Sequence, residues 1–79
     1  MKSKCVCCGH YTINNENPLY HDIYPVCFWE NDPIQNEKPD YVGGANKMSL
    51  NEAKKSYELY GAISQEFIQY VRKPFNDEI

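Results

Sequence analysis

The segment Lys4–Thr12, KCVCCGHYT, holds three of the four cysteines of the chain within four positions. Cys5 and Cys8 have the C-x-x-C spacing that lets two thiolates approach one tetrahedral ion from a tight turn. Gly9 follows them and can adopt the positive φ that such a turn requires. The segment therefore predicts half of a metal site, a redox pair or a group of packed thiols.

A third thiol comes from Cys27, nineteen positions after Cys8. A second C-x-x-C pair would begin at position 24, but this position is Tyr24, whose phenol stays protonated near pH 7. A tetrahedral zinc site needs a fourth donor. The side chains available for it are Cys7, His10 and His21.

The cysteines could have three other roles. Free cysteine is among the most buried residue types, so the thiols could simply pack in the core. A redox pair usually places its first cysteine at a helix N-terminus, whereas the segment after Cys8 is strand-like. A nucleophilic pair of Cys27 and His21 would need an orienting third group that the sequence does not supply. We therefore expect no enzymatic activity.

The second half of the chain is predicted to be helical. The stretch SLNE, Ser49–Glu52, fits a capping box at the start of a helix, and Gly61 suits the left-handed residue that ends one. Ser64 could cap a second helix, which Lys73–Pro74 would stop. The tail beyond Pro74 is expected to be loosely held.

The first half is predicted to contain a β-hairpin. Tyr11–Ile13 and Leu19–Tyr24 are β-prone runs, and the turn residues 14–18 lie between them. A polar loop is expected through Asp40. The predicted fold is a single α+β domain over residues 1–79, with a zinc-ribbon-like hairpin region (1–45) followed by two short α-helices (49–73).

Composition narrows the possible partners. The chain has 79 residues, a formal charge of −3 and no run of Lys or Arg, which argues against nucleic acid as a partner. It has neither an apolar stretch of signal-peptide length nor a window resembling a membrane span, so we expect no membrane association. We expect a cytoplasmic protein, in which clustered thiols more often bind metal than form disulfides.

An aromatic and acidic segment follows Cys27. Glu30 and Asp32 could form a binding surface for a basic protein, whereas Trp29, the single tryptophan, is expected in the core.

Four blocks of the sequence resemble one known family. They are CVCCGHYT (5–12), YPVCFWEND (24–32), GGANKMSLNEAKKSYELYGA (43–62) and VRKP (71–74). Together they resemble the cysteine-rich CPCC family of small, mostly bacterial proteins. The resemblance implies a zinc ribbon with two knuckles, in which Cys5, Cys8 and Cys27 occupy knuckle positions. Val6 stands in place of the knuckle proline and Tyr24 in place of a knuckle cysteine.

The sequence thus predicts a small cytoplasmic binding protein that carries structural Zn²⁺ and acts through protein–protein recognition, of an immunity or antitoxin type. The alternative is a thiol redox or metal-handling protein that uses Cys5, Cys7 and Cys8.

Overall fold

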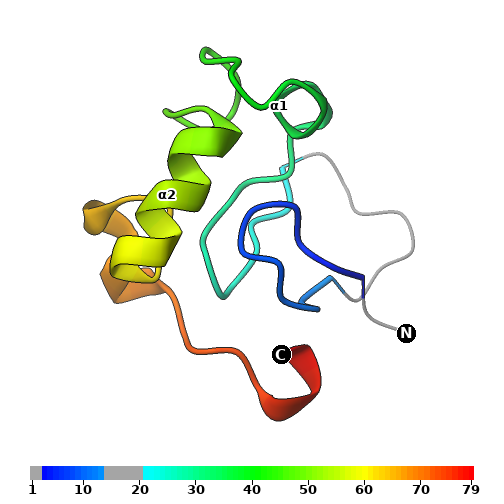
Figure 1. Cartoon of the computed structure of the whole chain (residues 1–79), viewed down its shortest axis with the longest axis vertical. Coiled ribbons are helices and arrows are strands. Elements are labelled where there is room, and N and C mark those ends of the chain that lie inside the picture. Colours follow the sequence, from blue (N-terminus) through cyan, green and yellow to red (C-terminus); the bar gives the residue numbers. More distant parts are fainter. Residues whose placement is uncertain (1–2, 14–20) are drawn as a thin grey trace.

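The computed structural model describes residues 3–13 and 21–79. In chain order the elements are α1 (Pro33–Glu37), α2 (Leu50–Tyr60) and two 3₁₀ helices, η1 (Gln65–Tyr70) and η2 (Asn76–Glu78). In Figure 1, α2 lies along one side of the central loops, and the red C-terminal turn comes back toward the blue N-terminal segment.

The predicted α+β fold with a β-hairpin is wrong. Within the described ranges the structure contains no β-strand, only isolated antiparallel bridges, Ser3 with Ile13 and Ile23 with Glu30. Ile13, from the first β-prone run, pairs with Ser3 across the segment that contains Cys5 and Cys8. Ile23, from the second run, pairs with Glu30 across the segment that contains Cys27. These two bridges therefore do not pair the runs with each other. The expected turn at residues 14–18, together with Leu19 and Tyr20, lies outside the described residues.

The predicted capping box of α2 is confirmed. The Ser49 hydroxyl accepts from the Glu52 N–H, the Glu52 carboxylate accepts from the Ser49 N–H, and Gly61 ends the helix with φ 79°. Leu50 and Ala53 are buried, which directs this face of α2 toward the core.

The second predicted α-helix is instead the 3₁₀ helix η1. The hydroxyl of Ser64 makes no capping bond, and after η1 the Arg72 N–H donates to the Pro25 carbonyl, which draws the chain away from helical geometry. Residues three apart eclipse in a 3₁₀ helix. Phe67 and Tyr70 therefore lie on one side, where both rings stack on Phe28.

Helix α1 replaces part of the predicted polar loop. Asp32 is its N-cap and Pro33 occupies the first turn, an arrangement that favours helix initiation. The Asp32 side chain accepts from the Ile34 N–H at 2.9 Å and from the Ala45 N–H at 2.9 Å. The same carboxylate thus starts α1 and fixes the glycine-rich segment before α2.

A buried amide network surrounds this carboxylate. Gln35 is fully buried and donates to the Met48 carbonyl, while its oxygen accepts from the Asn46 side chain. Asn46 in turn exchanges two hydrogen bonds of 2.9 Å with the backbone of Glu30. The network therefore holds the chain just after Cys27 against the segment that leads into α2.

The C-terminal tail is ordered rather than loosely held. Glu78 is buried and accepts two hydrogen bonds from the Arg72 guanidinium, which raises the pKa of Arg72. The guanidinium also lies 3.8 Å from the ring centroid of Phe75. The Glu78 carbonyl accepts from the Tyr11 N–H at 2.7 Å, which fastens the tail to the N-terminal segment.

The core is built from cysteines and aromatic rings. Trp29 is fully buried, as expected, and its indole N–H donates to the Asn36 side chain at 2.9 Å. The buried cluster also includes Cys5, Cys7, Ile13, Tyr24, Cys27, Leu50, Ala53 and Ile63. No helix among the described residues has the length and apolar character that a membrane span requires.

Gly44 provides a test of the buried network. A Cβ at this position would lie 2.5 Å from the Asp32 carboxylate and 2.7 Å from Gln35. Gly44→Ala should therefore lower the free energy of unfolding by about 3 kcal/mol through overpacking. The measurement is urea unfolding followed by tryptophan fluorescence.

Gly61→Ala is the matched control. Nothing lies within 4 Å of its Cβ position, so only its positive φ opposes a side chain, at about 1 kcal/mol. Equal losses in the two variants would contradict the tight packing around Gly44.

Candidate metal centre

Cys5 and Cys8 lie in a tight loop, residues 5–10, called here the first loop. The Cys5 N–H donates to the His10 carbonyl at 2.9 Å, and the Gly9 N–H donates to the Cys5 carbonyl at 3.0 Å. Gly9 has φ 78°, the conformation for which glycine is favoured. The loop folds back on itself and presents two cysteines from one turn.

Residues 24–29, called here the second loop, repeat this hydrogen-bond pattern. The Tyr24 N–H donates to the Trp29 carbonyl at 2.9 Å, and the Phe28 N–H donates to the Tyr24 carbonyl at 2.8 Å. Phe28 has φ 74°, although it is not a glycine. Its ring stacks on Phe67 with 4.6 Å between centroids, a contact that helps to offset the backbone strain.

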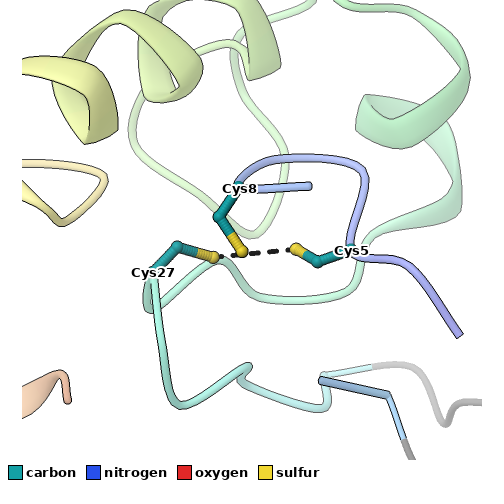
Figure 2. A group of neighbouring side chains, drawn as sticks. All are labelled: Cys5, Cys8 and Cys27. Atoms are coloured by element: carbon teal, nitrogen blue, oxygen red, sulfur yellow. Dashed lines mark hydrogen bonds between the residues drawn. The ribbon is translucent and has the colours of Figure 1, made fainter. Parts of the chain in front are cut away.

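The two loops bring three sulfur atoms together. The Sγ atoms of Cys5, Cys8 and Cys27 all lie within 4.8 Å of one another, and those of Cys5 and Cys27 are 3.7 Å apart. Figure 2 shows Cys5 and Cys8 on the blue segment facing Cys27 on the cyan segment. Zinc–sulfur bonds of about 2.3 Å in a tetrahedron place sulfurs about 3.8 Å apart. The spacing therefore suits one thiolate-bound metal ion.

Backbone groups stabilise negative charge on these sulfurs. The Cys7 N–H donates to the Cys5 sulfur and the Trp29 N–H to the Cys27 sulfur, each at 3.4 Å. The Cys5 side chain is 1 % exposed and that of Cys27 is 0 % exposed, whereas Cys8 is partly exposed. A metal held here would be shielded from water on most sides.

The three thiols do not ionise independently. Hydrogen bonds from Cys27 and then Cys8 lower the pKa of Cys5 to about 3. Hydrogen bonding to Cys5, together with burial, raises the pKa of Cys27, and the pKa of Cys8 is raised by its bonds to Cys27 and Cys5. Without metal, the cluster therefore carries one thiolate and two protonated thiols.

Neither histidine belongs to the sulfur group. In the described part of the chain, the mutually close ligand atoms are the three sulfurs alone. The His10 ring lies edge-on to Tyr57 with 6.0 Å between centroids. The His21 side chain is 66 % exposed, and its Nδ1 lies 2.7 Å from the Glu30 carboxylate.

Tyr24 occupies the second-loop position that corresponds to Cys5. The matching hydrogen bonds establish this correspondence, since both residues donate to the carbonyl five positions later. Tyr24 is buried, and burial followed by the charges of Cys5, Asp22 and Cys27 raises its pKa to about 12. The phenol therefore stays neutral at ordinary pH and is a poor metal ligand.

The predicted acidic surface is divided by the fold. Glu30 is half-buried beside His21, whereas Asp32 is 1 % exposed and directed inward. Burial opposes ionisation of Asp32, but the backbone N–H groups of Ala45, Gln35 and Ile34 outweigh it and lower the pKa. Asp32 serves the interior as a helix cap, so Glu30 is the member of the pair that can reach a partner.

Cys7, one of the three side chains considered above as a fourth donor, is buried. It is 7 % exposed and packs in the core cluster with Cys5 and Cys27. Residues 6–8 form a turn rather than a strand, so the alternation of side chains expected in a strand does not apply to Cys7 and Cys8.

Comparison with known proteins supports the sequence resemblance. A search of curated proteins found no match. The family described as Cysteine-rich CPCC matches residues 3–78, nearly the whole chain. Three cysteines of this chain converge at one buried point. Because the match covers nearly the whole chain, the protein belongs to the Cysteine-rich CPCC family.

Proposed function

We propose that this chain is a non-enzymatic zinc-binding protein in which Cys5, Cys8 and Cys27 hold one Zn²⁺. The observation that carries the proposal is the mutual approach of their sulfurs, within 4.8 Å, from two loops far apart in sequence. Thiolate donors at this spacing suit zinc better than calcium or magnesium, which prefer oxygen ligands. When bound, the ion would supply a cross-link and neutralise the thiolate charge.

The burial of the cluster favours a structural role for the metal. Catalytic zinc keeps an open position for water or substrate, whereas structural zinc is closed by protein ligands. Cys5 and Cys27 have almost no exposed surface. A 79-residue chain also gains much from a cross-link, because its core alone provides a small margin of stability.

Burial also weighs against the thiol redox or metal-handling alternative. A pKa of about 3 would make Cys5 a thiolate, which is the nucleophilic form. However, Cys5 and Cys7 are both buried, so only the partly exposed Cys8 of these three cysteines offers direct access to a disulfide or a metal-delivery partner. Slow alkylation of the native thiols would support the structural role, and fast alkylation would support the alternative.

Protein recognition remains part of the proposal, with an apolar patch as its site. Ile23 and Tyr70 are exposed beside the half-buried rings of Phe28 and Phe67. A hollow of about 110 Å³ with Glu30 on its lining opens next to these rings. The net charge of −3 favours a basic protein as the occupant, such as the toxin of an immunity pair.

Metal loading tests the zinc site directly. Purified, tag-free protein should contain about one zinc per chain, and a chelator should lower its melting temperature. Cys8→Ser should reduce zinc affinity by roughly 100-fold or more, because a coordinating thiolate is lost. Elemental analysis and competition with a chromophoric chelator measure both effects.

His21→Ala is the control for this experiment, because its imidazole lies outside the sulfur group and should leave the affinity unchanged. A wild-type chain that binds no zinc, or a Cys8→Ser chain with unaltered affinity, would refute the site.

The pKa shifts predict the pH dependence of this binding. Cys8 and Cys27 have raised pKa values, so each must release a proton when metal binds, whereas Cys5 is already ionised. Zinc affinity of a site formed by these three cysteines should therefore fall by about 100-fold per pH unit as the pH is lowered below 7, and a fourth cysteine ligand that also releases a proton would make the slope steeper. Competition titrations at several pH values, corrected for protonation of the competitor, measure the slope. An affinity independent of pH would contradict the assigned protonation states.

The apolar patch is tested by photocrosslinking in the native host. A photoreactive residue at position 70 should capture one basic protein, and Phe67→Ala should abolish the capture. The control places the same photoreactive residue at position 55. Lys55 is exposed on α2, in a polar region that also contains Asp40 and Glu58. Equal capture from both positions, or capture of nucleic acid alone, would refute the patch as a protein site.

A further inference from the structure

The zinc proposal leaves one coordination position to be filled. Three sulfurs converge in the structure, whereas a closed structural zinc site has four protein donors. The inference below concerns the fourth donor and rests on the proposed zinc site.

Tyr24 fills the place from which a fourth cysteine would reach the metal. The second loop repeats the hydrogen bonds of the first, so a cysteine at position 24 would stand as Cys5 does. Tyr24 is instead 5 % exposed and packed in the core cluster, with a phenol that keeps its proton. Because position 24 supplies no thiolate, the fourth donor must come from another residue or from solvent.

The two histidines are poorly placed for this role. His21 lies at the surface with Nδ1 against Glu30. His10 has its ring edge-on to the ring of Tyr57 in α2, with 6.0 Å between the centroids.

Cys7 is the remaining thiol, and it is already inside the core. Its backbone N–H donates to the Cys5 sulfur at 3.4 Å, so the residue adjoins the cluster. Cys7 also belongs to the same buried core cluster as Cys5 and Cys27. A hollow of about 380 Å³ next to the first loop is lined by Cys5, Cys7 and Cys8 together.

The backbone of the first loop allows adjacent cysteines to share an ion. Residues 6–8 form a turn rather than a strand. Successive side chains are about 100° apart in helical backbone and about 180° apart in a strand. Cys7 and Cys8 are therefore not forced to opposite sides of the chain, as they would be in a strand.

We propose that Cys7 is the fourth ligand and completes an all-thiolate site when zinc binds. Its sulfur lies outside the 4.8 Å group, so binding requires rotation of the Cys7 side chain into the cluster. The thiol proton passes to solvent and a sulfur lone pair forms the bond to the ion. Cys7 thus replaces the donor that this chain lacks at Tyr24.

X-ray absorption at the zinc edge counts the ligands. The zinc-loaded full-length chain should show four sulfurs at about 2.3 Å and no nitrogen or oxygen neighbour. Cys7→Ser should show three sulfurs and one light atom, with zinc affinity reduced at least tenfold. His10→Ala should keep four sulfurs.

A rescue variant guards against a folding defect in Cys7→Ser. The double variant Tyr24→Cys with Cys7→Ser should regain four sulfurs and wild-type affinity, because position 24 then supplies the donor. Failure of the double variant to fold leaves the wild-type ligand count as the deciding measurement.

The outcomes separate the two proposals. A wild-type chain without bound metal would overturn the zinc site itself. A wild-type chain that binds zinc through three sulfurs and a light atom would overturn only the role of Cys7. In that case, an imidazole scattering signature that disappears in His10→Ala or in His21→Ala would identify that histidine as the fourth donor, and the absence of this signature from the wild-type chain would identify solvent.

Discussion

The rest of the structure depends on the close approach of three thiols in a small buried volume. Hydrogen bonds among these thiols lower the pKa of Cys5 and raise the pKa values of Cys8 and Cys27, so in the absence of metal the sulfurs do not all ionise together. A divalent cation removes that restriction, because it lets all the sulfurs ionise together. The cluster is therefore arranged for an ion, and the two loops that carry it need support from the rest of the chain.

That support comes mainly from the second half of the sequence. The buried amide network holds Glu30, at the end of the second loop, through the side chain of Asn46. The C-terminal tail holds the first segment through the hydrogen bond from Tyr11 to Glu78. Both loops are thus positioned by residues distant in sequence. The fold therefore orients the three cysteines toward one point, where their sulfurs could hold a metal ion.

Features with a local cause could be predicted from the sequence. The capping box and Gly61 bound α2 because each acts within four residues of the backbone that it stabilises. The hairpin prediction was wrong because β-propensity does not specify a partner, and each run pairs across its own loop. Helix α1 was missed although Asp32 and Pro33 form a recognisable start, since the helix has only five residues.

By itself, the sequence determined the family, the position of α2 and the three thiols available to a metal, because spacing and local backbone chemistry are sufficient for each. Only the tertiary structure decided that Cys5, Cys8 and Cys27 meet, that both histidines lie outside this group, and that Cys7 is buried beside it. It also turned Asp32 from a presumed surface residue into an internal cap. These outcomes depend on contacts between segments far apart in the chain, which local propensities do not encode.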